Sequence, residues 1–376
     1  MTAQASPMDS FKRAISPTEE IVEEAREGRM FILVDAEGRE NEGDLVIPAQ
    51  FATPGAINFM AKYGRGLICL ALTAERTRQL GLQPMAARNQ ARMATAFTVS
   101  IEAKEGISTG ISAHDRAHTI AVAIDATKGG DDIVSPGHVF PLAAREGGAM
   151  VRAGHTEASV DIARMAGLNP AAVICEIMND DGTMARLPEL VTFAQFHNLK
   201  IGAIEELIAY RRATESFIDK VAEAPFETRA GTGFKMVVFR NRLDGVEHAA
   251  LVKGDIRADR PTLVRVHRID IAADVMGGFG QRAGLAEKAI AEVEKEGAGV
   301  VVLLRDFAPD SLSRRLTGAG SEDEHAETEQ RVVGLGSQIL RALGVRRMIV
   351  LAHTQARLVG LEGYGLTVDG WRGFKP

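Results

Sequence analysis

FILVDAEGRENEGDLVIPAQFA, residues 31–52, joins two apolar segments through a charged loop. Residues 31–36 and 45–52 are rich in the β-branched and large apolar side chains that favour strands. The intervening residues 37–44 contain four carboxylates and one guanidinium. We therefore expect a strand–loop–strand unit that carries a dense group of charged side chains at one end of a sheet.

The chain around this unit alternates between strand and helix patterns as far as residue 213. Residues 95–103 and 119–126 alternate apolar and polar side chains, which predicts half-buried strands. Residues 135–156 are rich in glycine and proline and are interpreted as one long loop, of a length typical of functional loops in compact domains. A helix with one apolar stripe follows in TEASVDIARMAGL, and two more helices precede residue 213.

The second half of the chain has a different pattern. Residues 213–234 carry few periodic signals and are interpreted as the connection between two domains. The strand-like segments that follow are KMVVFR, AALVKGDI, TLVRVHRI, VVVLLRD and RMIVLAH, with two amphipathic helices among them. We therefore predict two domains, residues 1–213 and 214–376, the second being a mixed α/β domain.

Composition and charge exclude several classes of protein. The 376 residues are 45% hydrophobic and 25% charged, as in an ordinary soluble globular protein. The net charge of −6 leaves no broad basic surface for a nucleic acid or an anionic membrane, and every apolar run is too short to span a bilayer. Two cysteines, Cys69 and Cys175, cannot form a disulfide framework, so we expect a cytoplasmic protein.

The charged loop admits two interpretations. Most charged runs are solvated surface, and composition alone favours that reading. Closely spaced carboxylates nevertheless repel one another unless a cation neutralises them, and hard oxygen ligands suit Mg²⁺ or Mn²⁺. Arg39 beside them could bind a phosphate or hydroxyl oxygen. The loop is therefore a candidate site for a cation and a substrate.

A second candidate lies at Arg152, Ala153, Gly154, His155 and Thr156. The glycine precedes a helix whose first N–H groups and dipole favour an anion. Thr156 is the expected N-cap of that helix, which would explain it as a structural residue. His155 is equally well explained as a surface histidine or as a metal ligand. An arginine, a helix start and a histidine together predict a corner that binds a phosphate and a metal.

Three further positions stand out by residue type. His138, in the tight turn 135–138, could project an imidazole into a cleft. Glu176 lies in the apolar stretch AAVICEIM, where burial would raise the pKa of a carboxyl and make it a candidate acid or base. A buried ion pair would explain Glu176 equally well. Residues 108–116 offer hydroxyls, a glycine and an arginine, as phosphate-binding loops do, although this pattern alone has low specificity.

These segments, in this order, resemble the 3,4-dihydroxy-2-butanone 4-phosphate synthase family. The resemblance covers nearly all of residues 15–212. It rests on the segments GRENEGDLVIPAQFATPGAINFMAKYGRGLICLALT, TAFTVSIEA, TGISAHDRAHTI, SPGHVFPL, RAGHTEASVDIARMAGLNPAAVICEIMNDDGTMARLPEL and IAYRR.

The resemblance implies an α+β fold whose first domain is a three-layer α/β/α arrangement around a mixed sheet. It implies conversion of ribulose 5-phosphate into the butanone phosphate and formate, with Mg²⁺ or Mn²⁺ as cofactor. Glu40 and His155 would ligate the ion, and His138 and Glu176 would be the catalytic pair. The residues implied in substrate binding are Arg39, Glu40, Asp44, Arg152, Ala153, Gly154, His155, Thr156 and Glu176. The family also implies a homodimer with active sites near the subunit interface.

Residues 214–376 resemble the GTP cyclohydrolase II family in TLVRVHRIDIAADVMGGFGQRAG, GSQILRALGVRRMIVLAHT and GLEGYGL. That family opens the guanine imidazole ring with a zinc ion held by three cysteines, and the corresponding positions here are Asp270, Gln281 and Ala283. One carboxylate, one amide and one methyl group make a poor zinc site. We therefore expect a folded, degenerate domain without catalysis and without zinc. Two alternatives stay open: a bifunctional enzyme with an atypical cyclohydrolase site, and a regulatory module that senses a nucleotide or docks a partner.

Overall fold

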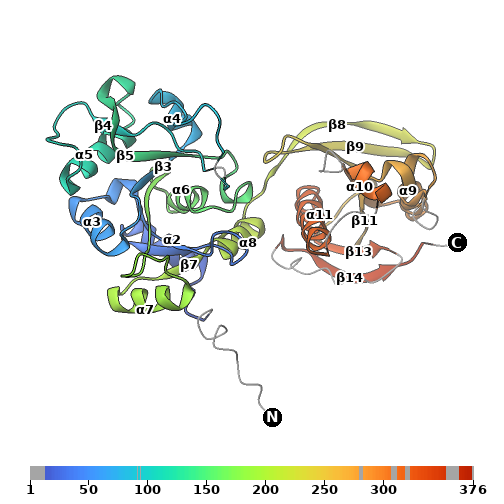
Figure 1. Cartoon of the computed structure of the whole chain (residues 1–376). Helices are drawn as coiled ribbons and strands as arrows, with labels where there is room; N and C mark the ends of the chain where they lie inside the picture. The colour runs from blue at the N-terminus through green and yellow to red at the C-terminus, as the bar shows by residue number, and fades with distance from the viewer. Residues whose placement is uncertain are drawn as a thin grey trace, which may run out of the picture. The chain divides into compact units, whose positions relative to one another are not determined.

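The computed structural model describes residues 13–90, 92–93, 95–278, 283–305, 311–317, 322–352 and 364–374, and within these it describes only the backbone of 314–315 and 322–331. The chain divides into two compact units, Met1–Arg211 and Arg212–Pro376 (Figure 1). The division falls two residues before the boundary expected from the sequence pattern. Each unit is built on a sheet of its own.

The first unit contains a mixed sheet of seven strands in the order β4-β5-β3-β6-β2-β1-β7. β3 pairs with β5 and β1 pairs with β7 in parallel, whereas the other neighbours run antiparallel. The strand bounds are β1 Phe31–Val34, β2 Gly43–Pro48, β3 Cys69–Thr73, β4 Ile101–Ala103, β5 Ile133–Ala144, β6 Ala171–Glu176 and β7 Ile201–Ala203.

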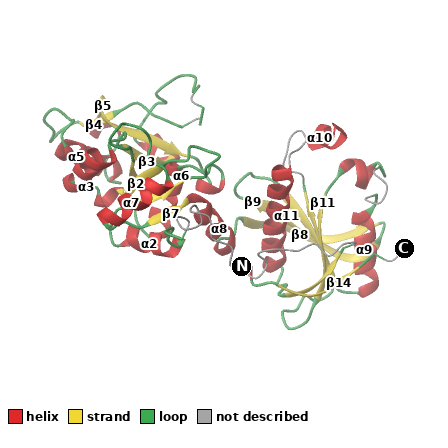
Figure 2. Cartoon of the chain, turned by 60° about the horizontal axis from the view of Figure 1, so that its bottom comes forward, coloured by secondary structure: helices red, strands yellow, loops and turns green. Residues whose placement is uncertain are grey.

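Helices cover both faces of this sheet (Figure 2). On one face α3, α5 and α7 pack apolar side chains on the strands, and on the other face α2, α6 and α8 do so. The expected three-layer α/β/α arrangement is therefore confirmed. The helix bounds are α2 Thr18–Arg26, α3 Pro54–Phe59, α4 Ala74–Gln79, α5 Ala113–Ile124, α6 His155–Met165, α7 Leu187–His197 and α8 Ile204–Thr214, and the short turns are η1 Ala49–Phe51, η2 Met60–Gly64, η3 Gly130–Asp132 and η4 Gly148–Met150.

β1 shows why the sequences of the central strands are continuous runs of apolar residues. Ile32 and Val34 belong to one core, and Phe31 and Leu33 belong to the other, so all four side chains are buried. A strand that is covered on both faces needs apolar side chains on both. The chain passes from β1 to β2 through residues 35–42, so the charged loop lies at the end of two buried strands.

The expectation of a strand at 119–126 is wrong, because these residues belong mostly to α5. Ser112 caps this helix by accepting the N–H of Asp115 at 3.0 Å. Ile120 and Ala123 lie one turn apart and are fully buried. The sequence TIAVAIDA fits the period of a strand and that of a helix, and packing against the sheet favours the helix.

The expectation of one long loop at 135–156 is also wrong. β5 continues to Ala144, and the turn η4 and the start of α6 occupy much of the rest. Ile101 pairs with Val139 and Glu102 pairs with Val134, so residues 135–138 bulge out of the ladder between β4 and β5. A bulge accommodates proline and glycine within a strand, which explains why the sequence has the composition of a loop.

The second unit has a seven-stranded mixed sheet in the order β14-β13-β11-β12-β10-β9-β8, with α11 on one face and α9 on the other (Figure 2). The predicted mixed α/β fold is confirmed. The bounds are β8 Ile218–Thr228, β9 Gly231–Asn241, β10 Glu247–Lys253, β11 Thr262–Arg268, η5 Ile271–Val275, α9 Leu285–Glu296, β12 Gly299–Leu304, α10 Ser311–Thr317, α11 Glu322–Ala342, β13 Arg347–Leu351 and β14 Thr367–Arg372.

Residues 218–228, expected to lie in a connection between domains, form the edge strand β8. Its side chains are almost all exposed, so burial imposes no apolar pattern on this part of the sequence. Pairing with β9, rather than packing, holds the strand in place. Across both units, no helix among the described residues is long and apolar enough to cross a membrane.

Candidate active site

Asp35 organises the charged loop between β1 and β2. Its buried side chain accepts the N–H groups of Glu40 at 3.0 Å and of Glu42 at 2.9 Å. It also accepts a hydrogen bond from Nη1 of Arg39 at 2.8 Å. Burial opposes the charged form of Asp35, but the donated N–H of Glu42 and the nearby positive groups outweigh burial and lower its pKa. The loop therefore folds back around one buried, ionised carboxylate.

Helix α6 begins at His155, with Gly154 as its N-cap. Thr156, expected as the N-cap, lies inside the first turn, because the carbonyl of Gly154 already accepts the N–H of Ala158 at 2.9 Å. Glycine has no side-chain oxygen, so no side chain caps this helix. The first N–H groups of α6 therefore remain available to an anion.

His155 turns its ring toward the charged loop. Its Nδ1 lies 3.9 Å from Oε2 of Glu40 and its Nε2 lies 3.9 Å from Oδ1 of Asp44, distances too long for direct hydrogen bonds. The ring is buried, and Nε2 has no hydrogen-bond partner among the described residues. Burial lowers the pKa of His155 despite the nearby charge of Asp35. The neutral ring therefore has a lone pair free to bind a ligand.

Asp35, Glu40 and His155 form a cluster that fits a divalent cation. One ligand atom from each residue lies within 4.8 Å of the others. Two carboxylates and a neutral imidazole are donors that Mg²⁺ and Mn²⁺ accept. A buried nitrogen without a partner is the kind of group that a bound ion satisfies. The cluster contains both ligands implied by the resemblance and adds Asp35.

Two guanidinium groups flank the start of α6. A Cβ atom built on Gly154 would lie 2.5 Å from Nη1 of Arg152, 3.0 Å from Oε2 of Glu157 and 3.1 Å from Nη2 of Arg39, so any side chain there would displace at least the Arg152 guanidinium. Arg152 donates to Oε2 of Glu157 at 2.7 Å and to the carbonyl of Met93 at 3.0 Å. Ala153 contributes the backbone between Arg152 and Gly154. Two guanidinium groups beside free helix N–H groups are an arrangement that favours an anion.

Asp44 and Glu176 are direct neighbours across the β2–β6 pair. Glu176 is half-buried, and its Oε2 accepts the N–H of Leu67 at 2.8 Å. Gly66 makes this approach possible, because a Cβ there would lie 2.5 Å from the same oxygen. Burial, and then the charge of Glu176, raise the pKa of Asp44 well above its usual range. A buried carboxyl that holds its proton more strongly than usual is suited to proton transfer.

His138 lies in the bulge of β5 rather than in the expected tight turn. β3 runs between β5 and β6, since Cys69 pairs with Phe140 on one side and with Ile174 on the other. His138 precedes Phe140 by two residues and Glu176 follows Ile174 by two, so both reach the same edge of the sheet. Their backbones are two strands apart, about 10 Å, and no hydrogen bond joins these two residues.

The sequence patterns did not single out Asp35 or Arg186. Arg186, from the start of α7, donates Nη1 to the carbonyl of Glu40 at 2.9 Å and also to that of Asn41. Asp35 had a usable signal, because it follows the buried strand FILV directly. Arg186 had none, since it lies far from the loop in sequence.

Both cysteines are free, buried thiols. Burial raises the pKa of each, that of Cys175 to about 12, and the charges of Glu176 and Asp44 act in the same direction. Because the thiolate is the reactive form, neither side chain is a nucleophile in this environment at neutral pH.

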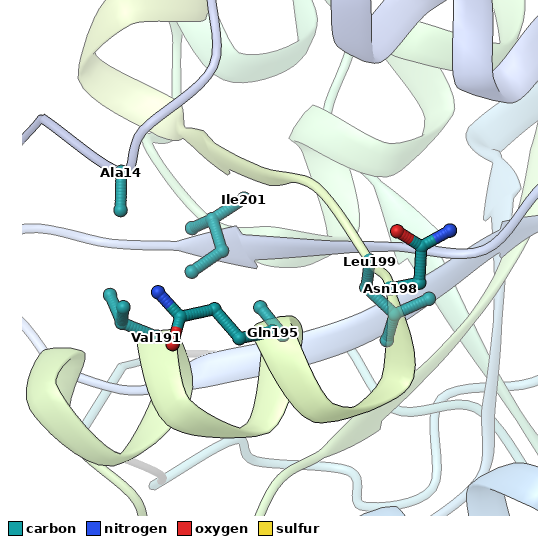
Figure 3. A pocket seen from close by; sticks show the side chains of 7 residues that line it. Ala14, Val191, Gln195, Asn198, Leu199 and Ile201 are labelled. Carbon is teal, nitrogen blue, oxygen red and sulfur yellow. The ribbon is translucent and has the colours of Figure 1, made fainter.

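Two hollows on the surface of the first unit lie on other residues. The smaller, of about 230 Å³, is lined by Ala14, Ile201 and residues at the end of α7 (Figure 3). The larger, of about 400 Å³, is mainly apolar and is lined by residues that include Phe51 and Phe59. Neither contains a residue that the sequence predicts for the site.

Comparison with protein-family models covers both units. Residues 19–210 match 3,4-dihydroxy-2-butanone 4-phosphate synthase. The chain belongs to this family. It is therefore an enzyme, a lyase of riboflavin biosynthesis, as the sequence resemblance implied. Residues 219–372 match GTP cyclohydrolase II, which confirms the resemblance of the second unit.

Known relatives extend over nearly the whole chain. The 3,4-dihydroxy-2-butanone 4-phosphate synthase of Neisseria meningitidis serogroup A is 49% identical over 95% of this chain and 98% of its own length. The riboflavin biosynthesis protein RibBA of Aquifex aeolicus is 48% identical over 96% of this chain and 93% of its own length. The relatives therefore share both units.

Solved structures give the same picture. RibBX, a two-domain 3,4-dihydroxy-2-butanone 4-phosphate synthase from A. baumannii, has 39% sequence identity and a TM-score of 0.73, and the match covers 95% of this chain and 99% of RibBX. A synthase in complex with two magnesium ions has 39% identity and a TM-score of 0.52, over 53% of this chain and 98% of its own. The α+β class is thus shared with experimentally determined relatives.

The second unit places no thiol at the positions expected for zinc. Asp270 is the N-cap of η5, where its Oδ1 accepts the N–H groups of Ala272 at 3.1 Å and Ala273 at 3.2 Å. Ala283 carries no ligand atom, and Gln281 lies outside the described residues. Both cysteines of the chain belong to the first unit. The one carboxylate of the expected set is therefore already engaged by the backbone.

Proposed function

We propose that the protein converts D-ribulose 5-phosphate into L-3,4-dihydroxy-2-butanone 4-phosphate and formate, with Mg²⁺ or Mn²⁺ as cofactor. The observation that carries the proposal is the Asp–Glu–His cluster beside two arginines at one helix start. A phosphorylated ketose needs a site for its phosphate, a cation for its oxygens and groups that exchange protons. The first unit offers all three at one end of its sheet, and family membership supports the reaction class.

Glu40 and His155 would hold the ion, and Asp35 lies close enough to join them or to orient them. When bound, the ion would polarise a substrate carbonyl and offset the negative charge that develops on it. The related synthase that binds two magnesium ions supports this choice of metal. We expect no zinc, because the second unit lacks the three cysteines that hold zinc in the GTP cyclohydrolase II family.

The start of α6 would bind the anionic end of the substrate, since two guanidinium groups and free N–H groups converge there. The carboxylates among the proposed binding residues would accept hydrogen bonds from substrate hydroxyls. The proposed binding residues are Arg39, Glu40, Asp44, Arg152, Ala153, Gly154, His155, Thr156 and Glu176.

His138 and Glu176 would transfer the protons. The reaction removes a proton from a carbon beside the ketone, loses water, rearranges the skeleton, takes up a water molecule again and releases one carbon as formate, so that no water is gained or lost overall. Each step moves a proton, so it needs groups that change protonation near neutral pH. Both residues lie at the same edge of the sheet, which supports their assignment as a pair.

We also propose that the second unit has no GTP cyclohydrolase II activity. The cap formed by Asp270 supports this, because a carboxylate that accepts two backbone N–H groups is a weak substitute for a zinc thiolate. The two free thiols of the first unit support a cytoplasmic location. The family resemblance supports a homodimer.

Formate release from ribulose 5-phosphate by the purified full chain tests the proposal. We expect formate with Mg²⁺, none after EDTA, and unchanged GTP in a parallel assay. Absence of formate in the presence of metal would contradict the synthase function. Opening of the GTP ring, together with roughly one zinc ion per chain, would instead support the bifunctional alternative. Heat on titration with GTP, without turnover, would support a nucleotide-sensing module.

Two substitutions test the catalytic pair. We expect His138→Ala and Glu176→Ala each to abolish formate release while the circular dichroism spectrum is unchanged. Glu205→Ala, an exposed carboxylate on α8, is the matched control and should keep full activity. Near-full activity of either site variant would remove that residue from the mechanism.

A further inference from the structure

A carboxylate outside the proposed binding set contacts the catalytic imidazole. Glu102, the middle residue of β4, has a largely buried side chain whose Oε1 is hydrogen-bonded to Nδ1 of His138. No described residue is hydrogen-bonded to the other ring nitrogen, Nε2, and the His138 side chain is 45% exposed. One nitrogen is therefore held by the protein and the other faces outward.

This contact determines which nitrogen carries the proton in the neutral ring. An ionised carboxylate has no proton to donate, so Nδ1 must be the donor and Nε2 must hold the lone pair. A base needs its lone pair directed at the proton it removes. Glu102 therefore selects the tautomer in which the outward-facing nitrogen can accept a proton.

Two glycines enclose the pair from separate segments. A Cβ on Gly110 would lie 1.7 Å from Oε1 of Glu102 and 2.8 Å from Nδ1 of His138. A Cβ on Gly137 would lie 2.1 Å from the carbonyl carbon of Ile101 and 2.5 Å from Cγ of Glu102. The backbone of both segments thus touches the pair, and neither position tolerates a side chain. Close packing on two sides limits rotation of the ring and of the carboxylate.

The segment that carries Gly110 is itself fixed by a buried carboxylate. Asp115, in the first turn of α5, accepts the hydroxyl of Ser108 at 2.8 Å and the N–H of Gly110 at 3.0 Å. Ser112 caps the same helix. Residues 108–112, part of the segment 108–116 that has the composition of a phosphate-binding loop, are therefore folded over Glu102 and His138 by contacts within their own segment.

Glu102 also faces the proposed site. Ile101 belongs to the core beneath α5, and the N–H of Ala103 donates to the hydroxyl of Thr119 on that helix. Because side chains alternate along a strand, Glu102 points to the opposite face of the sheet. That is the face on which Asp44 and Glu176 lie, since their strand neighbours Val46 and Ile174 pack in the core beneath α6.

We propose that Glu102 is a positioning residue, which holds His138 in the tautomer and orientation that present an unprotonated Nε2 to the substrate. The inference rests on the proposed catalytic role of His138. Glu102 does not touch the substrate in this scheme. Its negative charge also stabilises the imidazolium that forms when Nε2 takes a proton.

Steady-state formate release by full-length Glu102→Gln tests the proposal. Glutamine keeps the size of the side chain but removes the charge, and its amide can donate to Nδ1 and so favour the wrong tautomer. We expect kcat to fall about 10²-fold, with KM within about threefold of the wild-type value. Glu105→Gln, the same change at an exposed position three residues further on, should leave both constants unchanged.

A double-variant comparison separates positioning from a structural role. If Glu102 acts only through His138, the variant Glu102→Gln/His138→Gln will be no slower than His138→Gln alone. If the loss of kcat in the double variant equals the product of the losses in the two single variants, the proposal would be overturned. Full kcat in Glu102→Gln would also overturn it. In either of these cases a slow His138→Gln would leave the proposed function standing. A fully active His138→Gln would overturn the positioning role of Glu102 together with the catalytic role of His138, and the synthase function, which formate release reports, would stand.

Nitrogen-15 NMR of histidine-labelled full-length protein reads the tautomer without relying on turnover. The His138 signals are identified among the nine histidines by their absence in His138→Gln. We expect a protonated Nδ1 and an unprotonated Nε2 in the wild type, and loss of this pattern in Glu102→Gln. A protonated Nε2 in the neutral wild-type ring would overturn the proposal even if the Glu102 variant failed to fold.

Discussion

Replacing Gly154 by alanine tests the anion site with one added methyl group. Gly154 has φ −122° and ψ 158°, a conformation that alanine adopts without strain. The added Cβ would lie 2.5 Å from Nη1 of Arg152 and 3.1 Å from Nη2 of Arg39. Since ordinary contacts of a carbon atom are about 3.5 Å, the Arg152 guanidinium must move by about 1 Å.

The size of the effect follows from that displacement. A shift of about 1 Å in a group that positions substrate costs on the order of 10²-fold in rate, or about 2.7 kcal/mol in the barrier. The bond from Arg152 to Glu157 would lengthen, but the bond to the Met93 carbonyl can persist. We therefore expect the free energy of unfolding to fall by only about 1 kcal/mol.

The assay is kcat/KM for formate release, together with urea unfolding. Gly129→Ala is the matched control, because Gly129 also has a negative φ and no atom lies within 4 Å of its added Cβ. It should leave kcat/KM unchanged. If Gly154→Ala stays within about threefold of wild type, the arginines at this helix start do not bind substrate and the anion site is misplaced.

Three further outcomes follow from the same geometry. Mg²⁺ at 100 times its Kd should raise the free energy of unfolding of the wild type by about 2.7 kcal/mol, which raises the melting temperature of the first unit by roughly 5–10 °C. Differential scanning calorimetry should show this shift for the wild type and no such shift for His155→Gln. Hydrogen bonds from Ser108 and from backbone N–H groups lower the pKa of Asp115 to about 2 from an ordinary 3.8, so its ionised form stabilises the fold above pH 4. Urea unfolding should show that the loss of stability caused by Asp115→Asn becomes smaller as the pH falls toward 3. A loss of stability that does not depend on pH would contradict the assigned contacts. Light scattering should give twice the chain mass of 40.3 kDa, and the mass of one chain would remove the predicted homodimer.

The sequence predicts best those parts of the fold whose burial is symmetric or regular. β1 is covered on both faces, so FILV is apolar throughout and could be recognised as a strand. Residues 119–126 were wrongly expected to form a strand, because alternating small residues serve an α-helix as well as a strand. β8 was missed for the opposite reason, since an exposed edge strand carries no apolar pattern.

Some residues of the proposed site could be recognised from the sequence, and others could not. The charged loop and the run Arg152–Thr156 are contiguous in sequence, so their chemistry could be recognised before their geometry was known. Asp35 acts by accepting N–H groups of the loop, and Arg186 reaches the loop from a distant helix. Contacts of this kind depend on the path of the backbone, which residue types alone do not specify. Glu102 was not singled out for the same reason.

The fold of the second unit does not depend on cysteines at the positions expected for zinc. Its cores consist of apolar residues from the strands, α9 and α11, and none of them depends on a metal ligand. A zinc site, by contrast, needs all of its ligands at once. Asp270 accepts two N–H groups at the start of η5, a cap that stabilises such a helix start by about 1 kcal/mol. Asp270 therefore contributes to local folding, and replacing it by cysteine would remove the cap without supplying the other two zinc ligands.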